Sequence, residues 1–156
     1  MTFWLTILTA LGSGLIAGAF FVFSVAIMRA FRTLPSSAGA RSMQAINVVI
    51  LNPLFLGIFI GTAVLSAVLA ANSIMNWSAR GSGFLLAGSL LHIIGSFLVT
   101  IAFNVPLNNA LAAADLETDQ GKRVWENYLT VWTYWNHIRT IASTAATAML
   151  ILSMVR

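Results

Sequence analysis

The chain of 156 residues is too apolar and too sparsely charged to cover a water-facing surface. Hydrophobic residues make up 59% of it and charged residues 8%, whereas a soluble domain carries about 25% charged residues. The net charge of +4 comes from scattered arginines rather than a basic patch, so we expect no nucleic-acid partner. The absence of cysteine excludes disulfides, thiolate metal sites and a cysteine nucleophile. This composition predicts an integral membrane protein.

Four apolar stretches are each long enough to cross a hydrocarbon core of about 30 Å, which takes about 20 helical residues. They cover about residues 3–28, 47–71, 83–105 and 128–155, and only Arg139 interrupts the last one. The first stretch is too long for a signal-peptide core and lacks a basic start. Four helices with short links predict one all-α domain over residues 1–156, a four-helix transmembrane bundle.

The orientation of the bundle follows from its basic residues. Lysine and arginine favour cytoplasmic loops. We therefore place the first and third loops in the cytoplasm and both termini on the outer side. The residues on which this depends are Arg29, Arg32 and Arg41 in the first loop, Lys122 and Arg123 in the third, and Arg80 alone in the second.

Polar side chains, which are costly within a membrane, gather near the predicted cytoplasmic ends of the helices. Amides, an imidazole and a guanidinium from distant segments reach one depth, with aromatic residues around them. Mostly apolar walls with a few convergent polar groups are typical of a small-molecule pocket. The residues concerned are Asn47 and Asn52, Asn104 and Asn108, Asn136, His137 and Arg139, and Phe23 of the first helix.

The aromatic residues at this end have a simpler interpretation as an interfacial belt near the lipid headgroups. Amides are not belt residues, so the asparagines favour a binding site. The aromatic set comprises Trp125, Tyr128, Trp132, Tyr134 and Trp135.

Helix geometry restricts which polar residues can share a pocket. At about 100° per residue, His137 and Arg139 point about 160° apart, whereas Asn136 and Arg139 point about 60° apart. Either His137 faces the bundle interior, or Asn136 and Arg139 do. His92 belongs to a ladder spaced by four and is expected to be buried and hydrogen-bonded to a neighbouring helix. The ladder is Gly88, His92, Ser96, Thr100 and Asn104.

Several classes of protein are disfavoured. His92 and His137 differ in depth along their helices, which argues against a haem with two histidine ligands. No acidic residue lies within a span, so a carboxylate-bridged metal pair and a proton-coupled multidrug transporter are not expected. The chain also has no Ser/His/Asp arrangement, phosphate-binding loop or dinucleotide fingerprint.

Four motifs follow one another along nearly the whole chain. They are Gly18–Ser24, Met43–Asn47 leading to Asn52-Pro53, Asn104–Asn108 and Trp132–Thr140. Together they resemble the DUF1772 family, small four-helix membrane proteins that are often labelled anthrone oxygenase-like.

The resemblance implies oxidation of an anthrone-type aromatic by O2, with no bound metal, flavin or other cofactor. The implied base is His137, with Asn104, Asn108, Asn136 and Arg139 as donors to the developing oxyanion. If only the Arg139 face points inward, water or His92 has to serve as the base. Trp132, Trp135 and Phe23 would stack on the substrate, and Asn47, Asn52 and His92 complete the expected binding set.

A non-enzymatic bundle is the competing hypothesis. Such a bundle would bind a lipid, a small hydrophobic ligand or a protein partner as a scaffold or transport protein. Exposed faces of small residues would permit a homo-oligomer. In either case we expect the protein in a bacterial inner (plasma) membrane.

Overall fold

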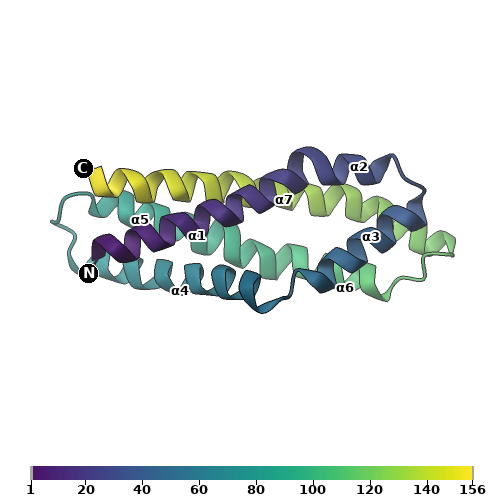
Figure 1. The fold of residues 1–156 in the computed structure, drawn as a ribbon, viewed down its shortest axis with the longest axis horizontal. Coiled ribbons are helices and arrows are strands. Elements are labelled where there is room, and N and C mark those ends of the chain that lie inside the picture. The colour runs from purple at the N-terminus through teal and green to yellow at the C-terminus, as the bar shows by residue number, and fades with distance from the viewer. Residues whose placement is uncertain (1, 156) are drawn as a thin grey trace.

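The structure, a computed structural model, describes residues 2–155 as an elongated bundle of helical columns (Figure 1). Within these residues, four helices are long and apolar enough to span a membrane, and no strand occurs. They are Thr2–Arg32, Pro53–Met75, Ser82–Ala113 and Asp119–Val155. The predicted all-α four-helix architecture is confirmed.

Two of the columns are continuous helices that contain π-helical turns. The first column consists of α1 (Thr2–Val22), η1 (Phe23–Ile27) and α2 (Met28–Arg32). The third consists of α5 (Ser82–Leu90), η2 (Leu91–Leu98), η3 (Thr100–Asn104) and α6 (Val105–Ala113), and the fourth is α7 (Asp119–Val155).

The second column is divided into α3 (Ser36–Val49) and α4 (Pro53–Met75). At about 1.5 Å per residue, the 23 residues of α4 extend about 35 Å, close to the thickness of a bilayer core. The other three columns are longer, and α3 lies beside their extensions at the end away from the termini (Figure 1).

The division between α3 and α4 corrects the predicted helix 47–71. Asn52 is extended (φ −77°, ψ 156°), as expected for a residue before proline, and Pro53 occupies the first turn of α4. The Asn52 side chain accepts a hydrogen bond from the Phe55 N–H at 3.0 Å and thereby caps α4. Asn47 belongs to α3, so the two asparagines lie on different helices.

The third and fourth helices extend beyond their predicted limits. The third was expected to end at residue 105, yet it continues through Pro106 to Ala113, directly after the π-helical turn η3. A wide turn of this kind accommodates a proline that lacks the N–H for a regular helical bond. The fourth begins at Asp119 rather than at residue 128.

The ladder of residues spaced by four does stay in the interior of the bundle. Gly88, His92, Ser96 and Asn104 are buried, and Thr100 is half-buried. In a regular α-helix such a ladder drifts by about 40° per step. The i→i+5 bonding of η2 and η3 takes more residues per turn, which reduces this drift and keeps the ladder on one face.

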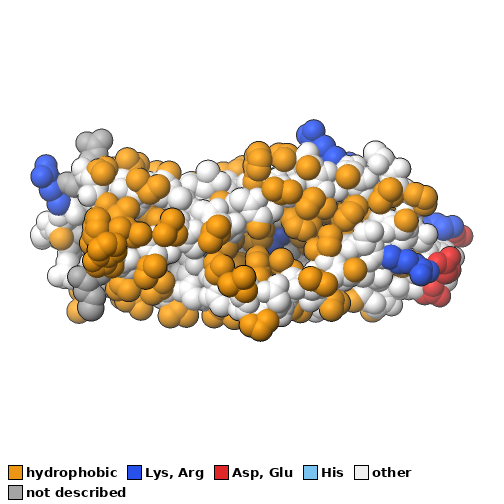
Figure 2. Space-filling model, in the orientation of Figure 1, with side chains coloured by type: hydrophobic (Ala, Val, Ile, Leu, Met, Phe, Trp, Pro, Cys, Tyr) orange, Lys and Arg blue, Asp and Glu red, His pale blue; other side chains and the backbone are white. Residues whose placement is uncertain are grey.

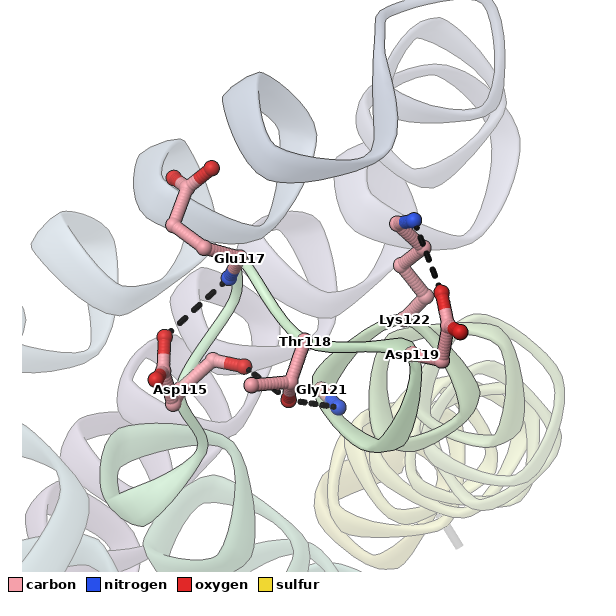
Figure 3. A network of polar contacts seen from close by, with 6 residues as sticks. All are labelled: Asp115, Glu117, Thr118, Asp119, Gly121 and Lys122. Carbon is pink, nitrogen blue, oxygen red and sulfur yellow. Dashed lines mark hydrogen bonds and ion pairs between the residues drawn. The ribbon is translucent and has the colours of Figure 1, made fainter.

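The two ends of the bundle differ in charge. Both termini and the α4–α5 loop lie at one end, and the α2–α3 and α6–α7 loops lie at the other (Figure 1). Acidic side chains are visible only at the second end (Figure 2). There the α6–α7 loop is ordered by local hydrogen bonds, including Glu117 N–H to Asp115 Oδ1 and Gly121 N–H to Thr118 Oγ1, both 3.1 Å (Figure 3).

Glycines set the closest approaches between neighbouring segments. A Cβ on Gly95 would collide with the Cβ of Ala142, so the backbone of η2 packs directly against this side chain of α7. Gly81 adopts φ +80°, and a side chain at this position would strike the Ser153 carbonyl. At these two points α7 lies close to η2 and to the turn before α5.

Candidate functional site

A cavity of about 190 Å³ lies where α3 gives way to α4. The gap between α3 and α4 leaves a space that is lined by residues from all four columns. Its walls are mostly apolar, with a few polar groups. They are formed by Ala19, Phe20 and Phe23; Met43, Ile46, Asn47, Ile50 and Leu51; Phe55, Leu56 and Phe59; Thr100, Ile101, Val105 and Asn108; and Trp132 and Arg139. Near the middle of the molecule, Figure 2 shows a basic side chain at the bottom of a hollow rimmed by apolar residues.

Arg139 is the ionisable side chain in the wall of this cavity, and it is 4% exposed. Its Nη1 donates to Thr100 Oγ1 at 3.2 Å, and its Nη2 donates to Asn136 Oδ1 at 2.8 Å. The guanidinium carbon lies 4.1 Å from the ring centre of Phe20 and 5.0 Å from that of Trp132. A guanidinium has five N–H donors, so several remain for a ligand, and Nε has no partner among residues 2–155.

No carboxylate compensates the charge of Arg139. The four acidic residues of the chain lie between positions 115 and 126, and all are exposed. The ion pairs of the described residues, Arg41–Glu117 and Lys122–Asp119, are on the surface. A buried charge without a partner costs several kcal/mol, and the two aromatic faces offset only part of that cost. The cavity is therefore suited to an anion, or to a group that becomes one.

Asn136 holds Arg139 in place and is itself fully buried. Its Nδ2 donates to the Phe20 carbonyl and to Ser24 Oγ, both at 2.8 Å, and its oxygen accepts from Arg139. Both amide hydrogens are used, so Asn136 is a positioning residue rather than an oxyanion donor, which corrects the expectation from the sequence.

A second polar group forms the rim of the cavity at the α3–α6 side. Asn108 Oδ1 accepts from the Tyr128 hydroxyl at 2.7 Å and from Trp132 Nε1 at 2.9 Å. Asn47 Nδ2 donates to the Tyr128 hydroxyl at 3.4 Å. These contacts join α3, α6 and α7. They orient Trp132 so that one face of its indole ring is directed toward Arg139.

The structure decides between the two alternatives for α7. His137 is exposed, whereas Asn136 and Arg139 are buried, as their angular separation requires. The expectation that His137 acts as the base inside the pocket is therefore not supported by its position. His92 is fully buried at the level of Ser13, away from the cavity wall.

Other predicted residues are distributed differently. Asn47, Asn108, Trp132 and Phe23 line the cavity. Asn52 is exposed and serves as a helix cap. Asn104 is buried behind the cavity, where its Nδ2 donates to the Trp132 carbonyl at 3.3 Å. Trp135 stacks on Phe103 outside the cavity, with ring centres 3.7 Å apart.

The interpretation of the aromatic set as a membrane belt is wrong for three of its five members. Trp125, Tyr128 and Trp132 are at most 5% exposed and form a core with Met28 and Met43. These residues gain more from burial against α2 and α3 than from the interface.

Sequence reasoning missed several residues of the wall. Phe55 and Phe59 follow the Asn52 cap by three and seven positions, so the correct start of α4 would have placed them on its inner face. Thr100 belongs to the ladder spaced by four, so the sequence predicts that it faces inward. Its hydrogen bond with Arg139 could not be predicted from that spacing.

The fold and the site define a four-helix membrane bundle with one uncompensated cation at an apolar, aromatic-lined cavity. A sequence model of the anthrone oxygenase family matches residues 52–149, well over half of the chain, and the chain belongs to this family. The matched region contains Arg139, Thr100, Asn108 and His92 but not Phe20. No curated protein and no solved structure is significantly similar to the chain.

Proposed function

We propose that the protein is a membrane oxygenase that oxidises the methylene of an anthrone-like aromatic with O2. In this reaction the CH2 group becomes a carbonyl, one oxygen atom enters the product, and the other leaves as water with the two hydrogens. Loss of one proton gives a ring-conjugated enolate, which transfers electrons to O2. Membership of the anthrone oxygenase family supports the reaction class.

The observation that carries the proposal is the position of Arg139. An enolate oxygen beside its free N–H groups would be stabilised without reorganisation, because Thr100 and Asn136 already hold the guanidinium. The surrounding rings exclude water, which strengthens the interaction with a developing anion. Phe20, Phe23 and Trp132 offer flat surfaces to an aromatic ligand.

The size of the cavity restricts how such a substrate fits. A cavity of about 150 Å³ takes up benzene, so about 190 Å³ holds roughly one ring next to Arg139. The other rings of an anthrone would extend toward the α3–α4 junction, where Leu51 is largely exposed. We therefore expect the substrate to enter from the lipid side at this junction.

Oxygen consumption with an anthrone by the purified protein in lipid vesicles tests the proposal. We expect a rate above the solvent background and one atom of ¹⁸O from ¹⁸O2 in the quinone. Arg139→Gln should lower kcat by about 100-fold, the usual effect of losing an oxyanion donor. Arg80→Gln, an exposed arginine at the other end, is the matched control and should retain the wild-type rate. Wild-type protein at background would contradict the proposal.

A second candidate function is binding without turnover. One observation favours it: Arg139 is the ionisable residue of the cavity wall, and a guanidinium does not accept a proton. A bundle of this kind would bind an anionic aromatic or lipid-like ligand tightly without consuming O2. The same assay separates the two functions, because binding alone would quench tryptophan fluorescence without any uptake of oxygen.

A further inference from the structure

We infer that His92 accepts the substrate proton through a chain of buried hydroxyl groups, an inference that rests on the proposed oxygenase function. Arg139 can stabilise the enolate, but a second group must remove the proton. The cavity wall does not contain such a group, and His137 is exposed. His92 is the other histidine of the chain, and it lies in the fully buried interior.

The hydrogen bonds of His92 fix which ring nitrogen is free. Ser13 Oγ donates its one hydrogen to the Ser143 carbonyl at 3.1 Å. The contact of 3.1 Å between Ser13 Oγ and His92 Nδ1 must then use a hydrogen on Nδ1. Neutral His92 therefore carries its proton on Nδ1, and Nε2 has a free lone pair. That atom is fully buried and has no partner among residues 2–155, so it is available as a proton acceptor.

Two hydroxyls, those of Ser96 and Thr100, lie between this nitrogen and the cavity along the third column. Thr100 lines the cavity, accepts from Arg139 and donates to the Ser96 carbonyl at 2.8 Å. Ser96 lies four residues from both Thr100 and His92, is fully buried, and its hydroxyl has no partner in the described part of the chain. The π-helical turns keep all three side chains on one face of the column.

The distance requires a relay rather than direct contact. Thr100 and His92 are eight residues apart, about two helical turns along the column. Unpartnered buried hydroxyls and a ring nitrogen are the kinds of group that bind internal water, and the proposed relay runs through Ser96 and such water molecules. α1, which contacts His92 through Ser13, and α4 and α5, which pack against η2, carry no charged or titratable side chain. The buried titratable side chains of α7 are Tyr128 and Arg139, and Arg139 is the nearer of the two in sequence to Ser143, which accepts from Ser13.

The step balances without another reactant. The C–H bond of the substrate breaks, its electron pair remains in the enolate, and the proton moves along the hydroxyls to His92 Nε2. The enolate carbon then bonds to O2 and passes its electrons to it, and the proton that His92 returns makes a hydroperoxide. The second C–H bond and the O–O bond then break: the C–H electron pair forms the C=O bond, and the departing hydroxide takes the C–H proton and leaves as water.

The test is anaerobic mixing of anthrone with the protein in vesicles, followed by absorbance of the coloured enolate, and then O2 uptake by the same samples. His92→Gln retains a donor for Ser13 but has no basic nitrogen. We expect it to slow enolate formation and kcat by about 100-fold, the typical effect of losing a general base, with unchanged affinity for anthrone. His137→Gln is the matched control and should behave as wild type.

A second pair of variants separates the relay from a structural role. Ser96 and Ser89 are both fully buried with unpartnered hydroxyls, but only Ser96 lies between His92 and the cavity. Ser96→Ala should slow enolate formation, and Ser89→Ala should not. The inference is overturned if His92→Gln forms the enolate at the wild-type rate, or if both serine variants are slowed equally. In both cases an active wild type leaves the oxygenase proposal intact, whereas an inactive wild type removes both.

Discussion

At the scale of single residues, Asn136 shows how one amide determines the position of a buried charge. It joins the Phe20 carbonyl, Ser24 and Arg139 through three hydrogen bonds of 2.8 Å. Asn136→Ala leaves all three groups with an unpaired donor or acceptor inside the bundle. We expect a loss of about 3 kcal/mol of stability, at about 1 kcal/mol for each bond. Activity should fall as well, because Arg139 loses its fixed orientation. Thermal unfolding in detergent and O2 uptake measure the two effects.

Asn104→Ala is a suitable comparison for this variant. Asn104 is 1% exposed, but it makes one long hydrogen bond of 3.3 Å, and its Oδ1 has no partner among residues 2–155. Its removal should cost about 1 kcal/mol or less. Equal destabilisation by the two substitutions would show that the Asn136 network does not hold Arg139 as described.

At the scale of elements, the α3–α4 junction creates the cavity, and its two asparagines have different tasks. Asn52→Ala removes the cap of α4 and should cost about 1 kcal/mol of stability while leaving KM unchanged. Asn47→Leu keeps a similar volume but removes an amide from the cavity wall, so KM should rise about fivefold, equivalent to about 1 kcal/mol. Melting temperature and KM of both variants check this separation. A raised KM in Asn52→Ala alone would contradict it.

The same junction shows what the sequence could and could not reveal. The spans were predictable because their apolar residues have no other stable environment than lipid. The break was not seen, because the apolar run Val48–Leu51 continues across it and hydropathy does not register a change in backbone direction. The Asn52-Pro53 pair carried the signal, since a residue before proline is extended.

The site was predictable only up to the choice between two faces of α7. Residue spacing excluded a shared pocket for His137 and Arg139 but could not say which of them faces inward, because both flanks of the helix carry aromatic and small residues. Packing decided it: Phe20, Thr100 and Asn136 together surround a guanidinium. Such a set of contacts among three columns cannot be read from one helix.

At the scale of the whole molecule, the charges determine how the bundle sits in the membrane. Five basic residues lie in or beside the α2–α3 and α6–α7 loops, namely Arg29, Arg32, Arg41, Lys122 and Arg123, whereas the sequence has Arg80 in the α4–α5 loop and Arg156 as its last residue. Because positive residues are retained in the cytoplasm during insertion, we expect the termini and the α4–α5 loop outside. The cavity then opens nearer the cytoplasmic leaflet.

The absence of native cysteine allows a direct test of this orientation, since a single introduced thiol is the only reactive one. Ser78 and Gln120 are both exposed polar residues in or next to loops at opposite ends. A membrane-impermeant maleimide added to intact cells should label Ser78→Cys, and it should label Gln120→Cys only after the membrane is permeabilised. The reverse pattern would place the basic loops outside and would move the cavity mouth to the outer leaflet. Labelling of both sites in intact cells would show that the chain inserts in two orientations, which the excess of basic residues in the first and third loops argues against.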